Sequence, residues 1–157
     1  MSLAKTRKNV LVMRSMSKGY SLAGLRFGFA IGHPDLIEGL VKVKDSYNVD
    51  AIAIAAATAA LADQEYRERT RQKVIAERER VRSALARIGL PSLPSQSNFL
   101  LTQAVRPTAR ELYESLKARR ILVRYFNSPG LDDRLRITVG TPEQDDVLIA
   151  ALKELVR

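Results

Sequence analysis

Residues 15–18 read Ser-Met-Ser-Lys, and Arg26 follows the lysine eight positions later. Serine hydroxyls and backbone N–H groups in a turn bind anions, and a guanidinium donates two parallel hydrogen bonds to a phosphate. A lysine amine condenses with a carbonyl carbon. Ser15, Ser17, Lys18 and Arg26 therefore predict a site in which Lys18 bonds a phosphorylated aldehyde while the other three hold its phosphate. The alternative is that Lys18 is a solvated turn residue and Arg26 forms a structural ion pair.

Two arginines nearer the C-terminus, Arg124 and Arg136, lie within predicted strands. Side chains in a strand alternate between two faces, so RLRITV at 134–139 predicts an apolar face and a polar face. The polar face would carry Arg134, Arg136 and Thr138. Two arginines on one face can bind an anion or simply face solvent, and Arg124 can equally mark the end of a strand. The residues alone leave both interpretations open.

The elements that would position these residues follow from the hydrophobic pattern and the turn residues. Strands are predicted at Asn9–Arg14, Phe27–Gly32, Asn98–Thr102, Ile121–Tyr125 and Arg134–Val139. Helices are predicted at Asp35–Lys44, Ala51–Ala62, Gln64–Ile88 and Ala109–Arg119, and after the capping residue Thr141. The unbroken apolar character of the first strand predicts burial on both faces of a mainly parallel sheet. A polar connection is expected at 45–50.

The long helix at 64–88 predicts a domain boundary within it or just before it. Residues 1–63 would form one segment, which carries Lys18. Residues 64–157 would form a second domain with the element order α-β-α-β-β-α, an α+β module.

Composition excludes several classes of site. The 157 residues include no cysteine and one histidine, His33, which argues against a disulfide framework, a thiolate nucleophile and a metal site. The net charge of +9 raises nucleic-acid binding as a possibility. Acidic and basic residues are interleaved over Glu65–Arg87, however, as in a solvated helix with ion pairs along its surface. No apolar run is long enough to cross a membrane. We expect a cytoplasmic protein that binds neither nucleic acid nor membrane.

The stretch SMSKGYSLAGLRFGFAIG resembles the lysine region of fold-type I pyridoxal-phosphate aminotransferases. Later segments, SNFLLT and ILVRYF…RLRITVGTPEQ, resemble the small domain of histidinol-phosphate aminotransferases. The resemblance implies an α/β fold, with the C-terminal part of a fold-type I large domain followed by the small α+β domain. Threonine-phosphate decarboxylases share the lysine motif, so a decarboxylase remains an alternative.

The resemblance also implies roles for single residues. Lys18 would bond pyridoxal phosphate and move the substrate proton, and Ser15, Ser17 and Arg26 would hold the cofactor phosphate. Arg136 would bind the carboxylate of glutamate and, in the other half-reaction, the substrate phosphate, with Arg124 as its partner. The implied reaction is transamination between histidinol phosphate, or a related amino compound, and 2-oxoglutarate in a homodimer.

Members of the resembled family are longer at the N-terminus. Their additional part supplies an acidic partner for the pyridine nitrogen, an aromatic residue against the ring and a further phosphate loop. We therefore expect this chain to correspond to a C-terminal portion that is inactive by itself. The alternative outside catalysis is a truncated domain kept for interaction or assembly.

Overall fold

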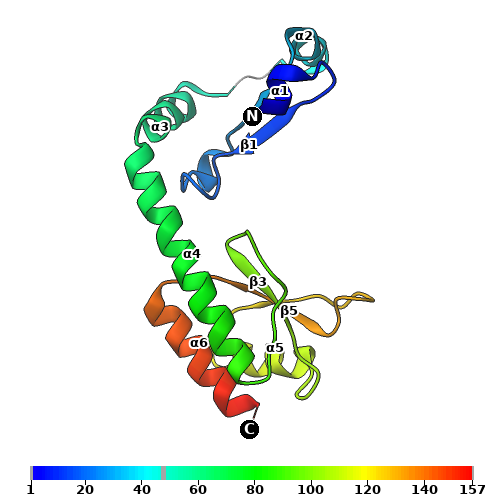
Figure 1. Ribbon diagram of the computed structural model, residues 1–157, viewed down its shortest axis with the longest axis vertical. Coiled ribbons are helices and arrows are strands. Elements are labelled where there is room, and N and C mark those ends of the chain that lie inside the picture. The colour runs from blue at the N-terminus through cyan, green and yellow to red at the C-terminus, as the bar shows by residue number, and fades with distance from the viewer. Residues whose placement is uncertain (1, 47–48, 157) are drawn as a thin grey trace. The chain divides into compact units, whose positions relative to one another are not determined.

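The computed structural model describes residues 2–46 and 49–156, which form two compact units, Met1–Arg71 and Gln72–Arg157 (Figure 1). The division falls inside a single helix, α4 (Gln64–Arg87). Assignment of the two units to the predicted domains 1–63 and 64–157 stays a prediction. The polar connection expected at 45–50 includes residues 47 and 48, which lie outside the described residues.

The first unit contains two short antiparallel strands and several helices. Its elements are α1 (Ser2–Thr6), β1 (Val12–Ser15), η1 (Ala23–Leu25), β2 (Gly28–Ile31), α2 (Pro34–Val43) and α3 (Ala51–Ala62). The pairing of β1 with β2 runs from Val12 opposite Ile31 to Ser15 opposite Gly28. Sequence reasoning missed α1, which is a single short helix.

The prediction of a parallel strand buried on both faces at Asn9–Arg14 is wrong. The strand pairs antiparallel with β2, and Met13 within it is 75% exposed. A parallel pairing needs a crossover connection, usually a helix. Residues 16–27 instead form turns and the single 3₁₀ turn η1, so the chain returns directly alongside β1.

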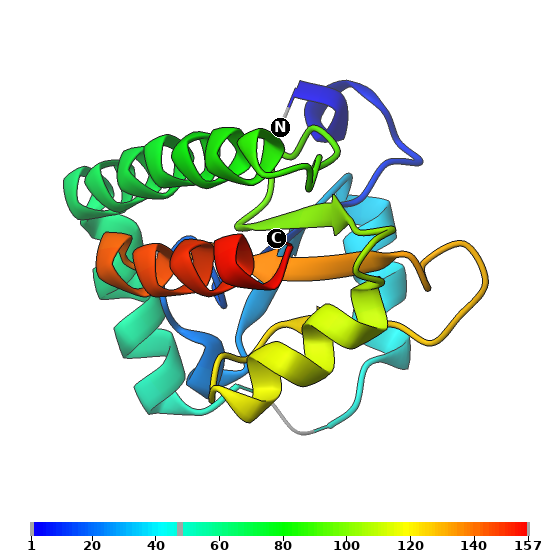
Figure 2. The same cartoon turned by 90° about the horizontal axis from the view of Figure 1, so that it is seen from below.

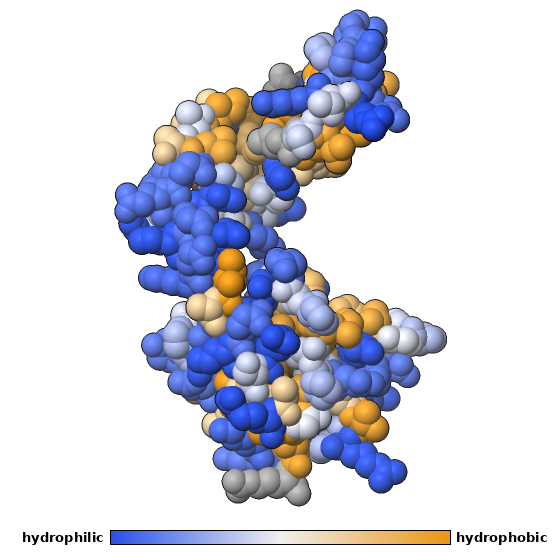
Figure 3. Space-filling model, viewed as in Figure 1, coloured by the Kyte–Doolittle hydropathy of each residue, from blue (hydrophilic) through white to orange (hydrophobic). Residues whose placement is uncertain are grey.

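Helices α2 and α3 of the first unit begin at side-chain caps. Asp50 accepts a hydrogen bond from the Ala53 N–H (2.8 Å) at the start of α3. His33, which the sequence did not assign to catalysis, caps α2 by accepting from the Asp35 N–H (3.3 Å). Helix α3 is apolar on all sides but buries only Ala53 and Ala57, and Figure 3 shows hydrophobic surface over this helix. The first unit therefore buries little of its apolar surface.

The second unit has the predicted order α-β-α-β-β-α. After α4 come β3 (Phe99–Gln103), α5 (Ala109–Ala118), β4 (Arg124–Tyr125), β5 (Arg134–Thr138) and α6 (Pro142–Leu155). The antiparallel sheet has the order β3-β5-β4. The strand predicted at Ile121–Tyr125 is too long, because only Arg124 and Tyr125 pair with β5.

Helices α4, α5 and α6 cover one face of this sheet (Figure 2). The core between them contains Val81, Ala84, Leu85, Leu90, Leu100, Ala104, Ala109, Leu112, Leu116, Leu135, Ile137, Leu148, Ile149, Ala151 and Leu152. Both predicted capping boxes are confirmed, at Thr108 with Glu111 and at Thr141 with Gln144. Within residues 2–46 and 49–156, no helix has the length and apolar character that crossing a membrane requires.

Candidate functional site

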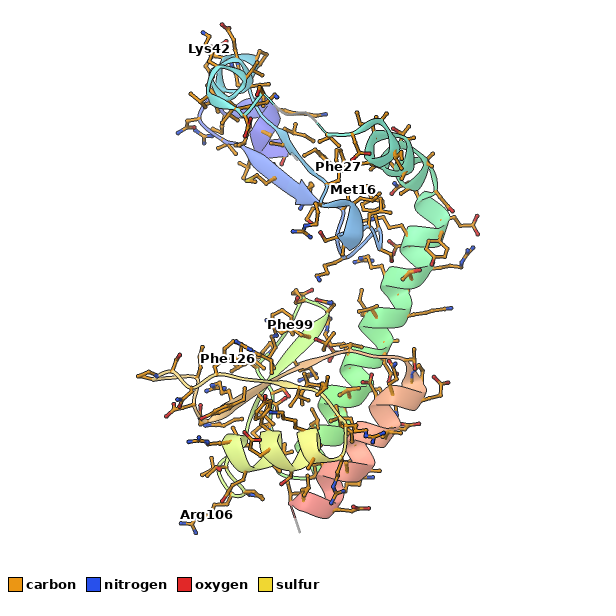
Figure 4. All side chains as sticks on the ribbon, turned by 180° about the vertical axis from the view of Figure 1, so that it is seen from behind. Met16, Phe27, Lys42, Phe99, Arg106 and Phe126 are labelled. Atoms are coloured by element: carbon orange, nitrogen blue, oxygen red, sulfur yellow. The ribbon has the colours of Figure 1, made fainter. Side chains whose placement is uncertain are left out.

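Lys18 lies in a turn that is closed by hydrogen bonds at both ends. The buried residue Met16 donates its N–H to the Phe27 carbonyl (3.1 Å) and accepts from the Leu22 N–H (3.1 Å). Met16 and Phe27 lie next to each other in Figure 4. The Ser21 N–H donates to the Lys18 carbonyl (3.1 Å). The Lys18 side chain is exposed, so a defined backbone presents an accessible amine.

The predicted phosphate-binding residues line one open cavity of about 590 Å³ in the first unit. Ser15, Ser17 and Arg26 contribute to its wall, together with Arg14 and residues 27–30 of β2 and its approach. Ser15 Oγ accepts a hydrogen bond from the Ser17 N–H (3.1 Å), which fixes the turn between them. Lys18 is not among the lining residues, although it follows Ser17 directly.

Arg26 holds an unusual backbone conformation. Its φ of 52° lies in the left-handed region, as does the φ of 57° at Ser21. Non-glycine residues adopt this region at a cost of about 1–2 kcal/mol. The Arg26 guanidinium donates through Nη1 to the Ala23 carbonyl (2.9 Å). The turn thus combines two strained residues with a side chain that has further N–H groups to donate.

Tyr20 links the turn that contains Lys18 to the first residues of α4. Its hydroxyl accepts a weak hydrogen bond from Gln64 Nε2 (3.4 Å), and the Arg67 guanidinium lies 5.3 Å from its ring centroid. A cavity of about 280 Å³ lies beside these residues, lined also by Gly19 and Asp63. Neither partner could be found from the sequence, because nothing in the local pattern pairs position 20 with positions 64 and 67.

Arg124 and Arg136 are directly opposite each other in the pairing of β4 with β5. Both side chains are exposed, while Leu135 and Ile137 are buried on the other face of β5. The predicted alternation is therefore confirmed. Arg134 lies on the same face as Arg136 and forms an ion pair with Asp133 (3.4 Å).

The structure brings the predicted residues together in two sets. Ser15, Ser17 and Arg26 share a cavity in the first unit, and Arg124 and Arg136 are neighbours in the second. The roles of these residues and of Lys18 stay predictions.

A buried carboxyl group at the start of α6 was not predicted. Asp145 is 2% exposed and accepts hydrogen bonds from the Gly140 N–H to both of its oxygens, each 3.2 Å long. Burial, with a smaller contribution from the Glu77 carboxylate, raises the pKa of Asp145 to about 6. Hydrogen bonding to Arg80 lowers the pKa of Glu77. Asp145 on α6 thus interacts with Glu77 on α4. These two carboxyl groups are separate from the pair Arg124 and Arg136.

The family model described as aminotransferase class I and II matches residues 1–152. The chain belongs to the class I and II aminotransferases. The predicted family resemblance is thereby confirmed, and so is the α/β fold of fold type I. Pyridoxal phosphate is the cofactor that this aminotransferase family implies.

Individual relatives resemble this chain over nearly all of its residues. Histidinol-phosphate aminotransferase 1 of Nostoc sp. is 52% identical over 156 residues, which are 99% of this chain and 44% of that protein. The structure of histidinol-phosphate aminotransferase from Sinorhizobium meliloti in complex with pyridoxal-5'-phosphate matches with a TM-score of 0.85 at 32% identity, covering 96% of this chain and 42% of that chain.

A decarboxylase is also similar. The structure of L-threonine-O-3-phosphate decarboxylase from Porphyromonas gingivalis matches with a TM-score of 0.82 at 29% identity, covering 98% of this chain and 48% of that chain. The chain therefore spans less than half the length of each of these three relatives.

Proposed function

We propose that this chain carries the cofactor lysine and the substrate arginines of an enzyme that transfers an amino group between histidinol phosphate and 2-oxoglutarate, with glutamate as a product. The observation that carries this proposal is the 52% identity to a histidinol-phosphate aminotransferase over 99% of the chain. The enzyme would be cytoplasmic and would work as a homodimer.

The residues of the first unit fit the phosphate end of pyridoxal phosphate. Ser15 and Ser17 offer hydroxyl donors and Arg26 a guanidinium, and all three line the same open cavity. A dianionic phosphate is best bound by several charge-assisted hydrogen bonds of this kind. Lys18 follows this cradle directly in the sequence and is exposed. We assign Ser15, Ser17 and Arg26 to the phosphate and Lys18 to covalent attachment.

Lys18 would also move the proton of the reaction. When bound, pyridoxal phosphate supplies an aldehyde that takes up the amino group and a ring that withdraws electrons from the substrate Cα. The released Lys18 amine would then accept the proton that leaves Cα, acting as a general base. The hydrogen-bonded turn around Met16 would hold the Lys18 backbone, and therefore the base of its side chain, in one place.

Arg136 and Arg124 would recognise the anionic ends of the substrates. Arg136 would bind the carboxylate of glutamate in one half-reaction and the phosphate of histidinol phosphate in the other. Arg124, directly opposite it in the sheet, would add a second guanidinium for the phosphate. A planar guanidinium suits both anions because each presents paired oxygens.

The domain assignment is part of the same proposal. Residues 1–63 would belong to the large domain and residues 64–157 to the small domain. We further propose that these 157 residues, which span 44% of the Nostoc relative, give negligible transamination when assayed alone. A single-turnover assay with glutamate tests this, and robust turnover would contradict it.

Borohydride reduction of the chain incubated with pyridoxal phosphate, followed by peptide mass mapping, tests the central assignment. We expect the label on Lys18 in preference to Lys5 and Lys8, which serve as matched internal controls in the same unit. Arg26→Gln should reduce labelling of Lys18 and leave the controls unchanged. Equal labelling of all three lysines would remove the basis for the proposed cofactor site.

The similarity to L-threonine-O-3-phosphate decarboxylase favours one second candidate, a pyridoxal-phosphate decarboxylase of a phosphorylated amino acid. Both activities need Lys18 and an arginine for phosphate. Product analysis of any active polypeptide that contains this sequence would separate the two activities, because only a decarboxylase releases CO₂ from its amino-acid substrate. CO₂ release without formation of glutamate from 2-oxoglutarate would favour the decarboxylase.

A further inference from the structure

The sheet face opposite the core of the second unit carries two arginines and two phenylalanines in contact. The Arg136 guanidinium lies 5.5 Å from the ring centroid of Phe99 and 5.8 Å from that of Phe126. The Arg124 guanidinium lies 5.4 Å from the same Phe126 ring. All three distances are within the range of attractive cation–π contacts. Figure 4 shows Phe99 and Phe126 on the sheet of this unit.

This arrangement places two like charges at directly opposed positions, since Arg124 pairs with Arg136 across β4 and β5. Like charges at opposed positions destabilise a sheet. In the part of the chain that the structure describes, neither guanidinium forms an ion pair with a carboxylate. The neighbouring Arg134, by contrast, has Asp133. The Phe126 ring is the contact that the two guanidiniums share.

We propose that Phe126, assisted by Phe99, is a positioning residue that holds the Arg124 and Arg136 guanidiniums ready for one phosphate or carboxylate group. The proposal rests on the proposed function, because it takes these arginines as the substrate-binding pair.

A guanidinium can contact an aromatic ring and bind an oxyanion at the same time. A ring contacts the flat face of the group, whereas an oxyanion is bound by the N–H groups along its edge. Contact with a ring also restricts the rotamers of a long side chain before the anion arrives, so less conformational entropy is lost on binding. The half-buried Phe126 would restrict two arginines and Phe99 one.

The test is a titration of the ¹⁵N-labelled chain with inorganic phosphate at constant ionic strength, observing the Nε–Hε signals of Arg124 and Arg136 by NMR. Phe126→Leu should raise the Kd for phosphate about fivefold, and Phe99→Leu about twofold, in line with the number of ring contacts each removes. Phe126→Tyr keeps a ring and should bind as the parent does.

Tyr66→Leu is the matched control, because it removes a ring that lies 5.9 Å from the Arg69 guanidinium in the other unit and should leave the Kd unchanged. A purely structural role for Phe126 would lower stability without this selective change in Kd. Should Phe126→Leu fail to fold, the twofold effect of Phe99→Leu decides the question.

The outcomes separate the inference from the function on which it rests. Unchanged phosphate binding in both leucine variants, with binding lost in Arg136→Gln, would overturn the role of the rings and leave the arginines as the anion site. Unchanged binding in Arg136→Gln, or no saturable shift in the parent chain, would overturn both the inference and the assignment of Arg136 to substrate. Neither result would affect the labelling of Lys18.

Discussion

In the second unit, helices α4, α5 and α6 bury leucines of β3 and β5, whereas in the first unit α3 leaves Ile52 75% exposed and α2 leaves Val43 80% exposed. The only large side chain that the first unit buries fully, among its described residues, is Met16. The second unit thus has a hydrophobic core that can stabilise it, and the first relies on local hydrogen bonds. The unit with the proposed cofactor lysine is the one with the smaller core.

Hydrogen exchange should reveal the largest difference between the units. Amides of β3 and β5 lie in a sheet packed on the core, so they exchange only through extensive unfolding. Amides of β1 and β2 belong to a two-stranded ladder with exposed side chains, which opens locally. We expect protection to differ about a thousandfold between the two pairs of strands. Equal protection, measured by NMR, would refute the comparison.

Substitutions of apolar side chains should give the next largest difference. Leu112→Ala removes a side chain that is 1% exposed in the core of the second unit and should lower the free energy of unfolding by about 3 kcal/mol. Val43→Ala, in the first unit, should change it by less than about 0.5 kcal/mol. Urea denaturation monitored by circular dichroism measures both values. A loss at Val43 as large as that at Leu112 would mean that the first unit has a core of its own.

The second unit should also respond to pH through Asp145. The pKa of Asp145 rises from 3.8 to about 6 on folding. Between these two pH values the folded protein keeps a proton on Asp145 that the unfolded chain has released. The free energy of unfolding should therefore fall as pH rises from about 4 to about 6. Glu77 acts oppositely, since its lowered pKa gives stability that is lost as pH falls.

Asp145→Asn isolates this effect, because the amide oxygen can still accept from the Gly140 N–H and the group cannot ionise. The variant should be more stable than the parent by about 2 kcal/mol at pH 7, with little difference at pH 4. Urea titrations across this range measure the change. A constant difference at every pH would show that Asp145 titrates as it does in the unfolded chain.

The smallest contrast concerns the caps of two helices. Thr141→Ala breaks the capping box of α6, which packs on the core, and should cost about 1 kcal/mol of global stability. His33→Ala removes the cap of α2, a helix with no buried residue, and should only fray that helix. Chemical denaturation measures the first effect and hydrogen exchange of α2 the second. A global loss in the His33 variant would contradict the expectation.

Sequence patterns predicted the second unit better than the first. The capping boxes at Thr108 and Thr141, and the alternation around Arg136, are local signals that the packed core reinforces. The first strand was predicted wrongly because an apolar run of this kind does not specify its partner. Its direction depends on the connection over 16–27, which lacks a crossover helix.

The candidate site was predictable where spacing carried the signal. Ser15, Ser17, Lys18 and Arg26 lie in one short stretch, and strand alternation places Arg136 on the polar face of its strand. Arg124 was a candidate only through the family resemblance. The contacts of Phe126 with both arginines and of Arg67 with Tyr20 could not be predicted. They join residues from different elements, and only the tertiary structure sets those distances.

The left-handed backbone at Ser21 and Arg26 has a consequence for laboratory evolution. Glycine adopts this conformation without steric cost, so a screen for heat resistance alone should enrich glycine at both positions. A screen that also demands cofactor retention should accept glycine at position 21 and reject it at position 26, because only the latter exchange discards a guanidinium.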